Sequence, residues 1–203
     1  MRKLTTTDIK DLREYERERD DFRRGVIAMK KRRRVPLGDL LSLTFENTDT
    51  MRFQVQEMAR AERMLTDEQI AHKVETYNQL IPDDGELVGT LFLEIDNKAM
   101  LYEWLPKLVG IQRAISFRVG AGDDGAGVDG GDGVVPSIPE DEDRLTREET
   151  TSAVHYLRFA SDDARREAFE RGPVRFVVDH PNYSVDVLLS DEQRAELAGD
   201  FGS

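Results

Sequence analysis

The chain has 203 residues, of which 38% are hydrophobic and 34% charged, and its formal net charge is −12. This length can bury the core of one domain, whereas the acidic surplus repels nucleic acid and anionic lipid except at a local basic patch. The absence of cysteine excludes disulfides, thiolate metal sites and cysteine nucleophiles. No window of about 18 apolar residues could cross a membrane, and the N-terminus lacks a signal-peptide core. We therefore expect a cytoplasmic protein.

The N-terminal third is expected to be mainly helical. Good cap residues occupy 5–8, and the alternating acids and bases of 11–24 suit a solvated helix with short-range ion pairs. Gly25 is a point at which this helix would divide in two. The proline and glycine of 35–38 end the region, because neither residue continues a helix.

Strands and helices follow along the rest of the chain. Alternation of apolar and polar residues predicts the strands, while caps and helical spacing predict the helices. The expected strands are 40–47, 87–95, 115–119, 151–159, 173–179 and 183–189. The expected helices are 50–65, 66–80, 97–108, 161–171 and a short one after 190. The sum is an α+β fold with a largely antiparallel sheet of about six strands.

Glycine and aspartate dominate residues 120–133, which have little to bury and predict a flexible surface loop. An acidic connector, 140–149, follows soon after. We interpret 120–150 as a flexible acidic, glycine-rich insertion in a single domain of 1–203. The alternative is calcium binding, but the spacing matches neither an EF-hand nor an RTX repeat.

Two carboxylates break the pattern of the helix 50–65. At about 100° per residue, Glu62 falls beside Met51 and Met58, and Glu57 also falls on the apolar side. Buried carboxylates are unfavourable unless they are paired, protonated or bound to a metal. Arginine or backbone amides of a neighbouring element, a ligand or metal site, or a different helix phase would each account for them.

Two of the three histidines also fall on apolar faces. Strand alternation places His155 with Leu157 and Phe159, and His180 ends the following strand in phase with apolar residues. Each has a simple interpretation, His155 as a hydrogen-bonded core residue and His180 as a turn residue. His72 lies on a polar helix and is expected to be exposed.

Four of these side chains have the donor types of an oxygen-and-imidazole metal site for Fe, Mn or Zn: Glu57, Glu62, His155 and His180. Their spacing contains neither the Glu-x-x-His pair of di-iron proteins nor a His-Glu-x-x-His motif. Glu46 and Glu94, on polar strand faces, are weaker candidates. The chain has no Walker A loop and no dinucleotide glycine fingerprint, so no nucleotide cofactor is expected.

Five consecutive cations stand out in this acidic chain: Lys30, Lys31, Arg32, Arg33 and Arg34. They could contact phosphates of a nucleic acid or nucleotide, although Phe22 is the closest upstream aromatic for base stacking. Alternatively, the run ends a helix, complements its C-terminal dipole and pairs with acidic segments of the chain. Docking of a partner protein with an acidic surface is equally open.

Residues 45–50 read Phe-Glu-Asn-Thr-Asp-Thr and are followed by Phe-Gln-Val-Gln-Glu-Met at 53–58 and Arg-Ala-Glu-Arg at 60–63. The other residues that carry a family resemblance are 12–15, 30–35, Tyr77, Asn78, Leu80, Pro82, 108–110, 151–155 and 179–181. Together they resemble an uncharacterised bacterial domain-of-unknown-function family of about this length. The resemblance implies a gene neighbourhood, in which relatives are often encoded beside rubrerythrin-like and iron–sulfur oxidoreductase proteins. It implies a redox or peroxide-response role.

Three hypotheses follow. The first is an accessory protein of a redox or oxidative-stress system, with a Glu/His pocket for a metal or small ligand and an oxidoreductase as its protein partner. The second is a nucleic-acid or phosphate-binding module that uses residues 30–34. The third is an interaction scaffold that docks an acidic partner. No catalytic residue is identified, and the sequence leaves open whether the protein is an enzyme.

Overall fold

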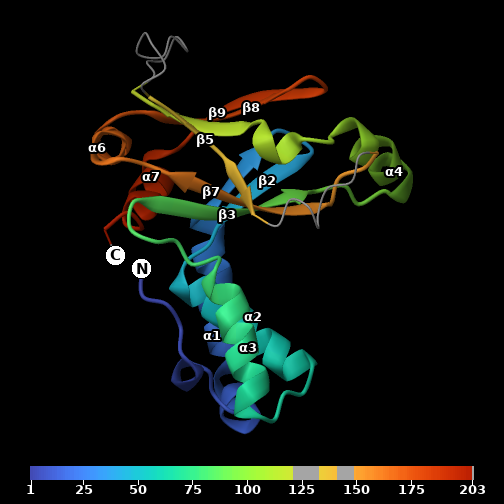
Figure 1. Ribbon diagram of the computed structural model, residues 1–203, viewed down its shortest axis with the longest axis vertical. Coiled ribbons are helices and arrows are strands. Elements are labelled where there is room, and N and C mark those ends of the chain that lie inside the picture. Colours follow the sequence, from blue (N-terminus) through green and yellow to red (C-terminus); the bar gives the residue numbers. More distant parts are fainter. Residues whose placement is uncertain (121–132, 141–148, 203) are drawn as a thin grey trace.

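A body of β-strands carries an arm of three helices (Figure 1). The computed structural model describes residues 1–120, 133–140 and 149–202. The arm consists of α1 (Leu12–Arg32), α2 (Thr48–Ala61) and α3 (Asp67–Asn78), preceded by the short 3₁₀ helix η1 (Thr6–Asp8). The other helices are α4 (Lys98–Lys107), η2 (Ile111–Arg113), α6 (Asp163–Arg171) and α7 (Asp191–Ala198). The predicted α+β fold is confirmed.

The strands form two antiparallel sheets rather than one. The first has the order β1-β2-β3-β7-β6 and the second the order β5-β4-β8-β9. The strands of the first sheet are β1 (Arg34–Leu37), β2 (Leu41–Phe45), β3 (Glu86–Leu93), β7 (Val154–Ala160) and β6 (Ile138–Glu140). Those of the second are β5 (Val134–Pro136), β4 (Ile115–Val119), β8 (Val174–His180) and β9 (Tyr183–Leu188). Within the described residues all strand pairs are antiparallel, as expected.

Three short strands were not predicted, which is why the described residues contain nine strands instead of about six. β1 includes Pro36, and proline is tolerated there because β1 is an edge strand. β5 and β6 lie within 133–140, inside the predicted insertion. The rest of that insertion, 121–132 and 141–148, lies outside the described residues.

The main core lies between the two sheets and is rich in phenylalanine. Phe45, Phe117, Phe159 and Phe176 are fully buried, and their ring centroids lie 5.3–6.2 Å apart in the contacting pairs. His155 lies on the same side of β7 as Phe159 and is 1% exposed, so its predicted face is confirmed. Tilted and edge-to-face ring pairs of this kind add to the stability gained from burial.

The arm is held together by a smaller core, which leaves much of α1 exposed. Its buried members are Leu4, Met51, Val55, Val74, Leu80, Ile81 and Val88. The 21-residue α1 contributes only Tyr15 and Val26 as buried residues. The helix also continues through Gly25, where a division was predicted. A single helical glycine costs roughly 1 kcal/mol relative to alanine, which a long helix tolerates.

Arg33 joins the arm to the body directly after the end of α1. Arg33 is 1% exposed, and its guanidinium donates to the backbone oxygens of Phe45, at 3.0 Å, and Glu46, at 3.3 Å. It also donates to the carboxylates of Asp200 and Glu196 beyond and within α7. Burial raises the pKa of Asp200, while the hydrogen bond from Arg33 opposes this shift. The buried guanidinium of Arg33 therefore connects the end of α1 to strand β2 and to the C-terminal segment.

Replacing Arg33 tests this junction. Arg33→Met should lower the free energy of unfolding by about 3–5 kcal/mol in urea titrations, because it leaves the Asp200 carboxylate buried without its cation. The double variant Arg33→Met/Asp200→Leu should recover much of the loss. A loss below about 1 kcal/mol, the value of an exposed ion pair, would contradict a role at the junction.

Candidate functional site

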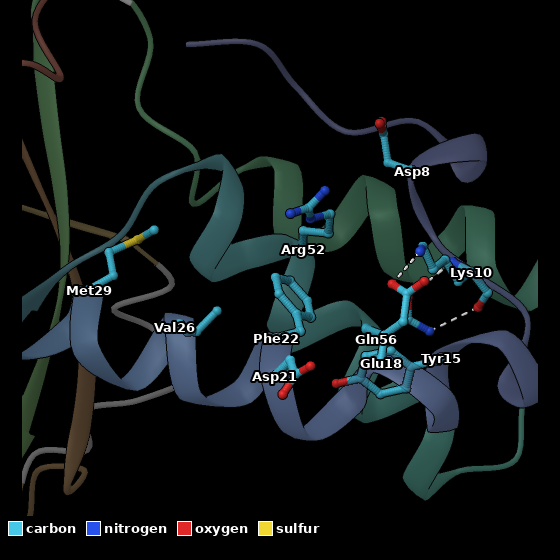
Figure 2. A pocket seen from close by; sticks show the side chains of 11 residues that line it. Asp8, Lys10, Tyr15, Glu18, Asp21, Phe22, Val26, Met29, Arg52 and Gln56 are labelled. Atoms are coloured by element: carbon cyan, nitrogen blue, oxygen red, sulfur yellow. Dashed lines mark hydrogen bonds and ion pairs between the residues drawn. The ribbon is translucent and has the colours of Figure 1, made fainter.

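A groove of about 580 Å³ lies between α1 and α2 (Figure 2). Its volume falls in the range of about 300–1,000 Å³ that is typical of ligand pockets. Four residues of α1 line it: Phe22, Gly25, Val26 and Met29. The series 22, 25, 29 and 22, 26, 29 are spaced by three and four residues, so these residues share one side of the helix. The apolar floor of the groove is therefore a stripe along α1.

An aromatic and cationic cluster forms the middle of the groove. The ring of Phe22 contacts Phe53 and Tyr15 edge to face, with centroids 5.7 and 6.4 Å away. The guanidinium of Arg52 lies 4.8 Å from the centroid of Phe22, and Figure 2 shows it above that ring. Arg52 is paired with Asp49, but its Nε is buried without a hydrogen-bond partner. A cation over an aromatic face can hold an anionic or aromatic group.

Both signs of charge border the apolar floor. Glu18 and Asp21 project from α1, and Lys10 lies at the end nearest the N-terminal segment. Lys10 pairs with Glu18, and Asp21 pairs with Arg24. An amphipathic partner suits such a surface better than a purely apolar or purely charged one.

Gln56 closes one end of the groove. Its side chain is 2% exposed; Oε1 accepts from the backbone N–H of Lys10 at 3.0 Å, and Nε2 donates to the Lys10 carbonyl at 2.9 Å. The segment between η1 and α1 is thereby tied across α2. It separates the groove from a second cavity of about 400 Å³, which Ile9 and Met64 help to line. Helical spacing puts Gln56 on the same side of α2 as Arg52 and Arg60, yet it is buried because the N-terminal segment covers it there.

The carboxylate of Glu57 is paired with an arginine. Arg19 donates to both of its oxygens at 2.8 Å, and the Tyr15 hydroxyl donates to Oε1 at 2.6 Å. The hydrogen bond from Arg19 lowers the pKa of Glu57, whereas burial and the neighbouring Glu57 raise the pKa of Tyr15. Of the alternatives for this residue, pairing with an arginine of a neighbouring helix matches the geometry.

Glu62 does not point into the arm, contrary to its predicted position. It follows the last residue of α2, is exposed, and forms an ion pair with Lys73 at 3.0 Å. The predicted helix continued to residue 65, so the face assigned to Glu62 was extrapolated past the real end. Leu65, the last residue of the predicted helix, is 82% exposed.

The two histidines have partners in separate places. His155 Nε2 lies 2.8 Å from Thr151 Oγ1 inside the body. His180 Nε2 lies 3.0 Å from the Val109 carbonyl, and its Nδ1 accepts from the backbone N–H of Asn182. His72 is exposed, as expected.

The structure does not bring the four predicted metal ligands together. Glu57 and Glu62 belong to the arm, His155 lies in the core between the sheets, and His180 lies at the β8–β9 turn. Across 1–120, 133–140 and 149–202, no group of three or more His, Cys, Asp or Glu side chains could hold a metal ion. The geometry of these residues therefore offers no support for the predicted Fe, Mn or Zn site.

The basic run is largely neutralised by acids of the same chain. The ion pairs are Lys30 with Glu46, Arg32 with Glu196, Arg33 with Asp200 and Glu196, and Arg34 with Glu94. Lys31 is exposed and has no ion pair within the described residues. This arrangement matches the interpretation in which the run ends a helix and pairs with acidic segments. Glu46 and Glu94, the two weaker candidates for metal ligands, are thus ion-pair partners of this run.

Comparison with known proteins places the chain in a family. Residues 3–201 match the family described as "Protein of unknown function (DUF3501)". The chain belongs to the DUF3501 family. It is also similar to a crystal structure of a novel protein of unknown function from Burkholderia pseudomallei K96243, with 34% identity and a TM-score of 0.85 over 98% of this chain and 99% of that one. No curated protein matches it.

The resemblance to an uncharacterised family is thus confirmed, and neither description states an activity. In the part of the chain that the structure describes, no helix is long and apolar enough to cross a membrane.

The Glu57 ion pair predicts a pH-dependent stability. A lowered folded pKa means that the pair stabilises the fold above the ordinary carboxyl pKa of about 4.3, and that this contribution is lost as the pH falls through the folded pKa. Glu57→Gln should therefore lower the unfolding free energy by about 1–2 kcal/mol at neutral pH, and the difference from the wild type should shrink in acid. Urea titrations across the acid range would measure this.

The matched control is Glu75→Gln, which removes an exposed carboxylate of α3. It should change stability little at any pH. A deficit in Glu57→Gln that stayed constant through the acid range would contradict the assignment of the ion pair.

Proposed function

We propose that this DUF3501 protein is an accessory protein that docks a helical segment of an oxidoreductase in the groove between α1 and α2. The observation that carries the proposal is the glycine in the floor of that groove.

Gly25 lies in the interior of α1, where glycine costs roughly 0.5–1 kcal/mol relative to alanine. Its backbone does not have a positive φ, and a Cβ built at this position meets no atom within 4 Å. The fold of the chain therefore does not require glycine here. A missing side chain in a groove floor permits close approach of another backbone, which is a common use of glycine.

The groove residues have the spacing of a helix-packing seam. Tyr15, Glu18, Phe22, Gly25 and Met29 follow one another at alternating intervals of three and four, the pattern of the a and d positions of a heptad. Only Tyr15 among them is buried. An amphipathic helix whose anchors recur at the same intervals fits such an incompletely covered seam.

The redox part of the proposal is supported by the family resemblance, which implies that relatives are encoded beside rubrerythrin-like and iron–sulfur oxidoreductase proteins. The chain has no cysteine and so no thiol of its own for redox chemistry. Binding an oxidoreductase is a role that needs neither a thiol nor the predicted Glu/His metal site. The acid-paired basic run provides less support for a nucleic-acid role.

Gly25→Leu should block docking by filling the groove floor. We expect the affinity for a rubrerythrin-like protein or an iron–sulfur oxidoreductase of the same organism, each titrated by calorimetry, to fall at least about tenfold, or 1.4 kcal/mol. Gly25→Ala should raise the unfolding free energy by about 0.5–1 kcal/mol, which confirms that α1 tolerates a side chain there. Arg17→Leu is the control, since it adds the same side chain at an exposed position outside the groove.

Lys31→Glu separates the groove from the basic run. Loss of binding in Lys31→Glu but not in Gly25→Leu would indicate that the basic run docks an acidic partner. It would overturn the assignment of the groove as the docking site. If neither oxidoreductase binds, the proposal that the docked partner is an oxidoreductase is overturned.

A further inference from the structure

Two arginines face each other across the outer side of the second sheet. In β4, Ile115, Phe117 and Val119 are buried, so the alternation places Arg118 on the opposite side. Arg118 is the register partner of Arg175 in β8. Like charges directly opposite each other on a sheet destabilise it, so this pair calls for a compensating anion.

The chain supplies an anion to only one of the two within the described residues. Arg175 Nε donates to Asp186 at 2.6 Å. Arg118 is half-buried, has no ion pair in the described part of the chain, and its Nε is buried without a hydrogen-bond partner. Arg23 and Lys31, which also lack an ion pair there, are by contrast exposed and can be solvated.

Apolar side chains flank the two guanidiniums. The strand registers pair Val134 with Arg118 and Leu188 with Arg175, giving one row across β5, β4, β8 and β9. Val134 is 37% exposed and Leu188 45%. Three strand spacings of about 4.8 Å make the row roughly 14 Å long. The order is apolar, cationic, cationic, apolar.

We propose that this row binds an acidic peptide segment of a partner protein, with a carboxylate between Arg118 and Arg175 and aliphatic side chains against Val134 and Leu188. Guanidinium and carboxylate form strong two-point hydrogen bonds, and the guanidinium of half-buried Arg118 has no carboxylate of its own within the described residues. A polyanion such as nucleic acid fits less well, because Asp186 lies close by and the chain has a net charge of −12.

A blocked five-residue peptide provides the probe: leucine, serine, glutamate, serine and leucine in that order. In an extended peptide its two leucines and glutamate share one side, and the leucines lie about 13 Å apart, close to the length of the row. The side-chain Nε–H signals of Arg118 and Arg175 should shift saturably in NMR titrations at millimolar peptide. The same peptide with glutamine for glutamate should bind at least tenfold more weakly.

Arg118→Glu is the decisive variant. It should abolish peptide binding while the melting temperature stays the same or rises, because the new carboxylate can pair with Arg175. Arg23→Glu makes the same charge change on α1 and should leave binding intact, as should Gly25→Leu, which separates this site from the groove. Equal binding of the glutamine peptide, wild-type binding by Arg118→Glu, or no saturable shift would each overturn the proposal.

Discussion

The burial of one guanidinium governs how the arm and the body meet. Arg33 can lie in the interior only because two backbone carbonyls and two carboxylates surround it. These acceptors come from the end of β2 and from the C-terminal segment, which are distant in sequence. An unpaired buried charge would be strongly unfavourable, so the end of α1 is held where all of these acceptors converge. The groove on α1 is therefore presented on a helix anchored to the body.

Elements with a local signal could be predicted from the sequence. Thr66, Asn97 and Ser190 accept hydrogen bonds at the starts of α3, α4 and α7, as expected of cap residues. Strands with clear alternation, such as β4, were predicted with the same bounds. The short strands β1, β5 and β6 could not be predicted in this way, because their pairing depends on neighbours rather than on a pattern of their own.

The candidate site was less predictable than the fold. The apolar face of His155 followed from strand alternation, whereas Glu62 was misplaced because a helix end can shift by several residues. The burial of Gln56 depends on a distant segment that crosses it, which no helical pattern reveals. Gly25 did carry a signal, but it was interpreted as a break and not as an opening in the helix surface. Arg118 became distinctive only when the register placed Arg175 opposite it.

The arm and the second sheet lie at opposite ends of the longest axis of the molecule (Figure 1). A protein shaped in this way can hold two binding partners without steric conflict, one at each end. Two molecules held by the same chain have a high effective concentration relative to each other, so a weak interaction between them is favoured. The elongated shape is thus itself suited to a molecular bridge.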